Sequence, residues 1–241
     1  MHPVPPRSSP NVATTRVHPS DAGAGGGVPH HAGAGAGRPA VYTVWKRSSM
    51  GFQGTDGFSV YDEAGALAFR VDNYSRRRKI FAGELMLMDG RGAPLLALRP
   101  QILSMRDQWN CYRASEEAGD KGTRRQQLFS MRKCSLVKNS DDAEVYMVGS
   151  KASASDQQDP SFRVQGSFWR RSCKIRSSDG EEVARITRKK AGAAAAPESV
   201  TLGDDVFSLT VMPGADGAMI MAVVVVMDRI CQRPYKPFMC S

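Results

Sequence analysis

Histidine is absent from most of the chain. All four histidines fall within the first 31 residues, which leaves none in residues 32–241. For that segment the absence excludes histidine-based acid–base catalysis, serine–histidine and cysteine–histidine nucleophile pairs, and most zinc or non-haem iron sites. We therefore expect no catalytic residues, no metal, no cofactor and no enzymatic activity. The four histidines are His2, His18, His30 and His31.

Cysteine is sparse, and the spacing of the cysteines matches no disulfide or zinc-binding pattern. The five cysteines are an odd number and include no C-x-x-C pair, which argues against a disulfide scaffold and against a zinc site. A reducing compartment fits best, with the thiols acting as small apolar core residues. They are Cys111, Cys134, Cys173, Cys231 and Cys240.

The apolar run near the C-terminus is too short to cross a membrane as a helix. Residues 218–227 are ten apolar residues in a row, whereas a spanning helix needs about 20. Asp216 is placed to cap a helix over residues 215–231, and Arg229 lies near its negative end. Such a helix would be about 24 Å long and apolar on all sides, so protein should surround it. The four consecutive valines also suit a buried strand, and periodicity leaves that alternative open.

Glycine, alanine and proline dominate residues 1–39 and leave almost nothing to bury. Such a segment cannot offset the entropy of ordering, so we expect a disordered tail. We expect residues 40–233 to form one domain and residues 234–241 a short tail. The first 11 residues lack the apolar run of a secretory signal, and glycine and proline disfavour a transit peptide. We expect a cytoplasmic protein, with the plasma-membrane periphery and the nucleus as alternatives, and no organelle targeting.

From residue 41 onward, short apolar runs alternate with turn residues. Leu67, Phe69 and Val71 are separated by polar or small residues, the period of a strand with one buried face. Turns at residues 63–65, 90–92 and 178–180 join pairs of such runs into hairpins. The hairpins cover residues 58–73, 84–99 and 173–188. Further strands are predicted at residues 41–46, 108–113, 127–133, 144–148, 162–168 and 206–212, and exposed loops between strands at 115–124 and 191–198.

About a dozen strands at this spacing are typical of an all-β barrel or sandwich. A barrel of that size has a lumen too wide for its own side chains to fill. A central helix solves this packing problem, and the apolar C-terminal run is suited to the role. The residues expected to belong to this central helix are Met219, Ile220, Met221, Val223, Val224, Val225 and Val226.

Several motifs, taken in order and spacing, resemble the LURP-one-related domains of plants. They are YTVWK at residues 42–46, GFSVYD at 57–62, FRVDNY at 69–74, LMDG at 87–90, SCKI at 172–175 and LTVMPG at 209–214, followed by Asp216 and the apolar run. The resemblance spans residues 41–233 and implies a tubby C-terminal-like β-barrel of about twelve strands enclosing a hydrophobic C-terminal α-helix. It also implies kinship with phospholipid scramblases and with membrane-tethered transcription regulators that bind phosphoinositides, and a role in plant defence.

Positive charge is in excess, with a formal net charge of +9 and a pI near 9.5. A basic surface attracts anionic partners such as the anionic leaflet of a membrane. Arg76, Arg77, Arg78 and Lys79 are four consecutive cations, and arginine matches phosphate bidentately, so they are the first candidates for binding a lipid headgroup. Secondary basic patches are Arg124, Arg125, Arg170, Arg171, Arg188, Lys189 and Lys190. The alternative for each run is a solvated loop that aids solubility.

Three functions compete on these observations. The first is a regulatory module that binds anionic phosphoinositide headgroups through basic loops. The second is a protein-interaction scaffold in plant defence or stress signalling. The third is nucleic-acid binding, which is disfavoured because no helix-turn-helix, zinc finger or basic zipper is present.

Overall fold

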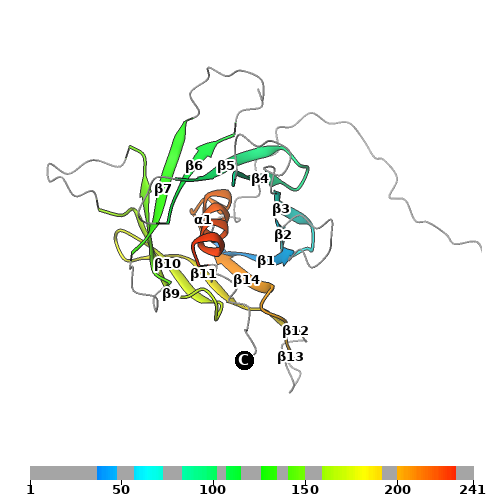
Figure 1. Ribbon diagram of the computed structural model, residues 1–241. Coiled ribbons are helices and arrows are strands. Elements are labelled where there is room, and N and C mark those ends of the chain that lie inside the picture. Colours follow the sequence, from blue (N-terminus) through cyan, green and yellow to red (C-terminus); the bar gives the residue numbers. More distant parts are fainter. Residues whose placement is uncertain are drawn as a thin grey trace, which may run out of the picture. The chain divides into compact units, whose positions relative to one another are not determined.

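Antiparallel strands close into a barrel, and helix α1 lies inside the ring that they form (Figure 1). The computed structural model describes residues 37–47, 57–72, 83–101, 107–114, 126–134, 141–149, 159–191 and 200–231. All of these belong to one unit of the chain, residues 32–241. Of the predicted tail, residues 1–36 lie outside the described residues.

Twelve strands make up the barrel, in the order β1-β14-β11-β10-β9-β8-β7-β6-β5-β4-β3-β2. The ring closes because β1 pairs with both β2 and β14. The predicted fold class is therefore confirmed. The barrel strands are β1 (Ala40–Arg47), β2 (Gly57–Tyr61), β3 (Leu67–Asp72), β4 (Leu85–Asp89), β5 (Pro94–Pro100), β6 (Gln108–Arg113), β7 (Gln127–Lys133), β8 (Ala143–Met147), β9 (Phe162–Ser167), β10 (Ser172–Ser177), β11 (Glu182–Arg188) and β14 (Val206–Val211).

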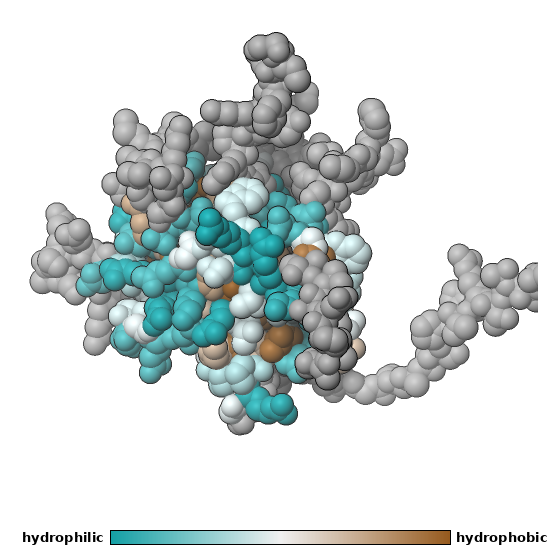
Figure 2. Space-filling model, turned by 90° about the horizontal axis from the view of Figure 1, so that it is seen from below, coloured by the Kyte–Doolittle hydropathy of each residue, from teal (hydrophilic) through white to brown (hydrophobic). Residues whose placement is uncertain are grey.

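Alternation along the strands separates an apolar lumen from a polar outer wall. In β14, Phe207, Leu209 and Val211 are buried while the residues between them are partly exposed. In β10, Cys173 and Ile175 are buried and Lys174 is exposed, as the sequence predicts. Seen from below the view of Figure 1, the described surface is mostly hydrophilic with isolated hydrophobic areas (Figure 2).

Helix α1 (Gly217–Ile230) supplies the centre of the core. Asp216 caps it, since its carboxylate accepts hydrogen bonds from the backbone N–H groups of Ala218 (2.9 Å) and Met219 (3.2 Å). Every residue from Ile220 to Asp228 is buried, and Arg229 lies in the last turn. The apolar run is thus a helix within the lumen and not a buried strand. Within the described ranges, no helix has the length and apolarity needed to cross a membrane.

The strand registers give the barrel two distinct ends. At one end Gly217 begins α1 close to the Tyr42 hydroxyl, and at the other Lys46 of the same strand β1 reaches Asp228 in the last turn. We call these the cap end, where Asp216 caps α1, and the clasp end, where Lys46 pairs with Asp228.

The structure corrects three local expectations. A two-stranded sheet, β12 (Lys190–Ala191) with β13 (Val200–Thr201), was not predicted, and Ala191 lies in it and not in a loop. Cys134 is exposed because it follows the end of β7, whereas Cys111, Cys173 and Cys231 are buried as expected. The helix is not apolar on all sides, because Asp228 carries a buried charge in its last turn.

Candidate functional site: the clasp end of the barrel

Two basic runs that are separate in the sequence meet at the clasp end. Arg170 belongs to the turn between β9 and β10, and Arg188 ends β11. The Nε of Arg188 donates to the carbonyl oxygen of Arg170 at 3.2 Å, and its Nη2 lies 3.3 Å from Oδ1 of Asp204. Exposed Lys190 and half-buried Lys189 follow directly. The structure therefore joins Arg170, Arg188, Lys189 and Lys190 into one surface, the clasp-end cation cluster.

The turn that presents Arg170 is fixed by the neighbouring chain. Asp141, which precedes β8, accepts a hydrogen bond from the backbone N–H of Phe168 at 2.9 Å. The N–H of Arg171 donates to the carbonyl of Phe168 at 3.0 Å and closes the turn. Arg171 itself has a φ of 51°, in the left-handed region that residues with a side chain rarely adopt. A strained conformation of this kind persists only where the surroundings fix it.

Those surroundings are aromatic, and they remove Arg171 from the predicted surface patch. Its guanidinium carbon lies 4.6 Å from the ring centre of Phe168 and 4.3 Å from that of Phe207, and only 4% of the residue is exposed. Its Nε donates to the carbonyl oxygen of Asp204 at 2.9 Å. Burial lowers the pKa of Arg171, and the carboxylates of Asp228 and Asp204 oppose that shift. Arg171 therefore supports the end of the barrel from within and does not offer its charge to a surface ligand.

The pair that defines the clasp end lies beneath this surface. Nζ of Lys46 is 2.9 Å from Oδ1 of Asp228, and the side chain of Asp228 is 4% exposed against 19% for Lys46. A buried carboxylate is costly unless it is paired. Sequence reasoning missed this pair. The one local signal was a lone acidic residue at the end of an apolar run, and nothing near it in the sequence indicates its partner.

Two tryptophans expose large apolar surface at the same end. Trp169, next to Arg170, is 37% exposed, and Trp45, next to Lys46, is 53% exposed. Trp45 is paired with Val206, the first residue of β14, which places it near the clasp end of the wall. Tryptophan at the edge of a cationic surface is typical of proteins that contact the membrane interface.

The remaining predicted basic residues lie outside the described residues. Arg76, Arg77, Arg78 and Lys79 follow Asp72, and Arg124 and Arg125 precede β7. The described strands next to the two groups end at opposite ends of the barrel. Asp72 is paired with Gly57, which in turn is paired with Arg47 at the clasp end, so the chain leaves β3 there. By contrast, β6 ends and β7 begins at the cap end.

The thiols of the described residues are not activated. Burial raises the pKa of Cys111, Cys173 and Cys231 to about 12. Cys134 reaches solvent, yet partial burial and the carboxylates of Glu144 and Asp142 raise its pKa to about 11. A nucleophilic cysteine needs a lowered pKa. Across the part of the chain that the structure describes, no three His, Cys, Asp or Glu side chains are grouped so that they could hold a metal ion.

A closed twelve-stranded antiparallel barrel around a buried C-terminal helix defines the class of fold. The sequence profile of the LURP-one-related family matches residues 40–228, and the chain belongs to this family. It is 38% identical to Protein LURP-one-related 5 of Arabidopsis thaliana over 187 residues, covering 77% of this chain and 80% of that protein. It is 33% identical to Protein LURP-one-related 17 of the same plant over 193 residues, covering 78% and 81%.

The fold is also similar to a solved structure. An X-ray structure of an Arabidopsis thaliana protein superimposes with a TM-score of 0.54 at 24% identity, over 82% of this chain and 94% of that one. The likeness concerns the path of the backbone.

Proposed function

We propose that the chain is a non-enzymatic module that binds anionic lipid headgroups, phosphoinositides above all, through the clasp end. One observation carries the proposal: the clasp-end cation cluster and two exposed tryptophans lie at the same end of the barrel. A membrane-binding surface combines these two features, because cations meet headgroup phosphates while indole rings enter the interface.

The chemistry of the cluster suits a phosphorylated headgroup. Arg170 and Lys190 are exposed. Arg188 is paired with Asp204, but both side chains are exposed to water, so the pair is weak. Arginine offers phosphate a planar pair of donors and lysine adds a point charge. Each basic residue near an anionic surface contributes about 1 kcal/mol.

The predicted Arg76–Lys79 run adds to the proposal through topology alone. The described strands that flank the run, β3 before it and β4 after it, end and begin at the clasp end, where the cluster lies. We propose that both contribute to one binding surface. The role in plant defence that the family resemblance implies would then be exerted at a membrane.

Vesicle flotation tests this function. Wild-type protein should float with phosphatidylcholine vesicles that contain a phosphoinositide and not with phosphatidylcholine alone, and binding should weaken as salt rises. The triple variant Arg170→Ala, Lys189→Ala and Lys190→Ala should bind about 100-fold more weakly, since three contacts of about 1 kcal/mol are lost. Trp169→Ala should weaken binding further without changing its dependence on salt.

A matched control removes the same charge from the other end. Arg38, Arg91 and Arg113 are exposed, and their strands meet the cap end. Their triple alanine variant should float like the wild type. If the two triple variants lose vesicle binding equally, the loss reflects net charge alone and contradicts a binding site at the clasp end. If only the variant with Arg76, Arg77, Arg78 and Lys79 changed to alanine loses binding, the loop is the site and the cluster is not.

A further inference from the structure

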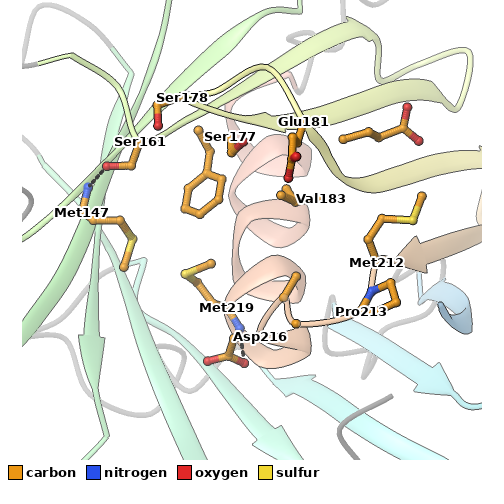
Figure 3. Close-up of a pocket in the computed structure, with 14 residues that line it drawn as sticks. Met147, Ser161, Ser177, Ser178, Glu181, Val183, Met212, Pro213, Asp216 and Met219 are labelled. Atoms are coloured by element: carbon orange, nitrogen blue, oxygen red, sulfur yellow. Dashed lines mark hydrogen bonds between the residues drawn. The ribbon is translucent and has the colours of Figure 1, made fainter. Parts of the chain in front are cut away.

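A pocket of about 690 Å³ lies at the cap end, between the first turn of α1 and the wall formed by β8 to β11 (Figure 3). This volume is within the range of small-molecule sites. Figure 3 shows Met147 reaching from β8 and Met219 from α1 into the same space. The apolar part of the lining comprises Met147, Phe162, Val183, Met212, Pro213 and Met219.

The pocket results from the position of the helix in the barrel. The backbone of α1 approaches β5, β6 and β7 most closely, so space remains on another side of the helix, where the pocket lies against β8 to β11. Three methionines line that space, and methionine side chains adapt to apolar ligands of varied shape. The lining thus favours an apolar body.

Charge on the pocket is of one sign. Its ionisable lining residues are Glu181, Glu182 and Asp216. Asp216 is occupied as the cap of α1, and Glu182 is paired with Arg185 at 2.6 Å and Lys174 at 3.5 Å. Glu181 is exposed, and its carboxylate makes no hydrogen bond or ion pair within the described part of the chain. With this lining the pocket disfavours an anionic ligand, and the carboxylate of Glu181 remains to pair with a cationic one.

The lining holds a second polar group, the hydroxyl of Ser177. Oγ of Ser177 is buried and makes no hydrogen bond with any described residue. A buried hydroxyl without a partner carries a desolvation cost that a ligand donor or acceptor would relieve. Ser177 ends β10 and Glu181 precedes β11, so the hydroxyl and the carboxylate flank the same hairpin turn.

From these observations we infer that the cap-end pocket binds a small amphiphilic amine, with its apolar body among the methionines. The ammonium group lies near Glu181, and a polar atom of the ligand hydrogen-bonds to Ser177. This site is separate from the lipid-binding surface proposed above and does not depend on it.

Displacement of a fluorescent apolar probe, N-phenylnaphthylamine, from the full-length protein tests the inference. Decylamine, decanol and decanoate have the same chain with positive, neutral and negative head groups. We expect the amine to displace the probe at the lowest concentration and decanoate at the highest. Equal displacement by decylamine and decanoate, or stronger displacement by decanoate, would overturn the inference.

Charge reversal locates the site. Glu181→Lys should weaken the binding of decylamine about fivefold, as expected for one partly exposed charge pair, and should strengthen the binding of decanoate. Asp179→Lys is the matched control, because Asp179 is exposed in the same turn and does not line the pocket. It should leave the order and affinities unchanged. If the two variants have identical effects, the cause is long-range charge and not a site.

Ala215→Trp, which fills the pocket, should abolish probe binding. If this variant is folded, as judged by circular dichroism, and still binds the probe, the probe binds elsewhere.

Discussion

The two ends of the barrel use carboxylates in different ways. At the cap end they satisfy backbone groups: Asp62 accepts from the N–H of Ala66, Asp89 from that of Ala93, and Asp216 caps α1. At the clasp end Asp228 is buried against Lys46, and Arg171 lies close to it between two aromatic rings. Carboxylates therefore fix turns at both ends, since Asp141 does the same at the clasp end, but at the clasp end Asp228 is also buried in the lumen and paired with a cation.

The difference between the two ends follows the dipole of helix α1. Its N-terminus carries partial positive charge and its C-terminus partial negative charge. Asp216 complements the first, and Lys46, Arg171 and Arg229 gather near the second. The dipole of α1 is thus complemented by a carboxylate at its N-terminus and by cations near its C-terminus.

Breaking the clasp should have the largest effect on stability. Lys46→Met removes the ammonium that Asp228 contacts and should lower the free energy of unfolding by about 3 kcal/mol, measured by urea denaturation. Adding Asp228→Leu should restore most of the loss, because an apolar pair replaces a buried charge. If the double variant is no more stable than Lys46→Met alone, the pair does not account for the loss.

Removing the cap should have a smaller effect at the other end. Asp216→Ala leaves two N–H groups at the start of α1 without their acceptor and should cost about 1 kcal/mol, seen as a modest fall in Tm. Asp216→Asn, which keeps an acceptor, serves as the control and should retain most of the stability. A loss as large as that of Lys46→Met would contradict the comparison between the ends.

Acid should reveal the smallest effect. Hydrogen bonds from Arg185 lower the pKa of Glu182 below its ordinary value of 4.5. The stabilisation it provides is fully present above pH 4.5 and is lost as the pH falls through the lowered pKa. Glu182→Gln should therefore lower Tm slightly near neutral pH, leave Tm unchanged below the lowered pKa, and so flatten the dependence of Tm on pH between these two ranges. An unaltered acid profile would mean that Glu182 makes no such contribution.

The sequence predicts the fold well because local patterns specify it. Strands at residues 108–113 and 127–133 have the predicted bounds, and Asp216 caps the helix as expected. The clasp could not be predicted in this way, since Lys46 and Asp228 lie 182 residues apart. Nor could the different fates of Arg170 and Arg171, because adjacent arginines look alike until the turn places one outside and the other between Phe168 and Phe207.

The pairing of the first strand with the last also determines when this chain can fold. β1 needs β14 as a neighbour, and the helix that fills the lumen is made after both. Before that moment a partly synthesised chain has open strand edges and an empty centre, both of which invite association with other chains. Contacts between distant segments also slow folding. The barrel can therefore close only after β14 is synthesised, and a chaperone that shields the open strands until then would raise the yield of folded protein.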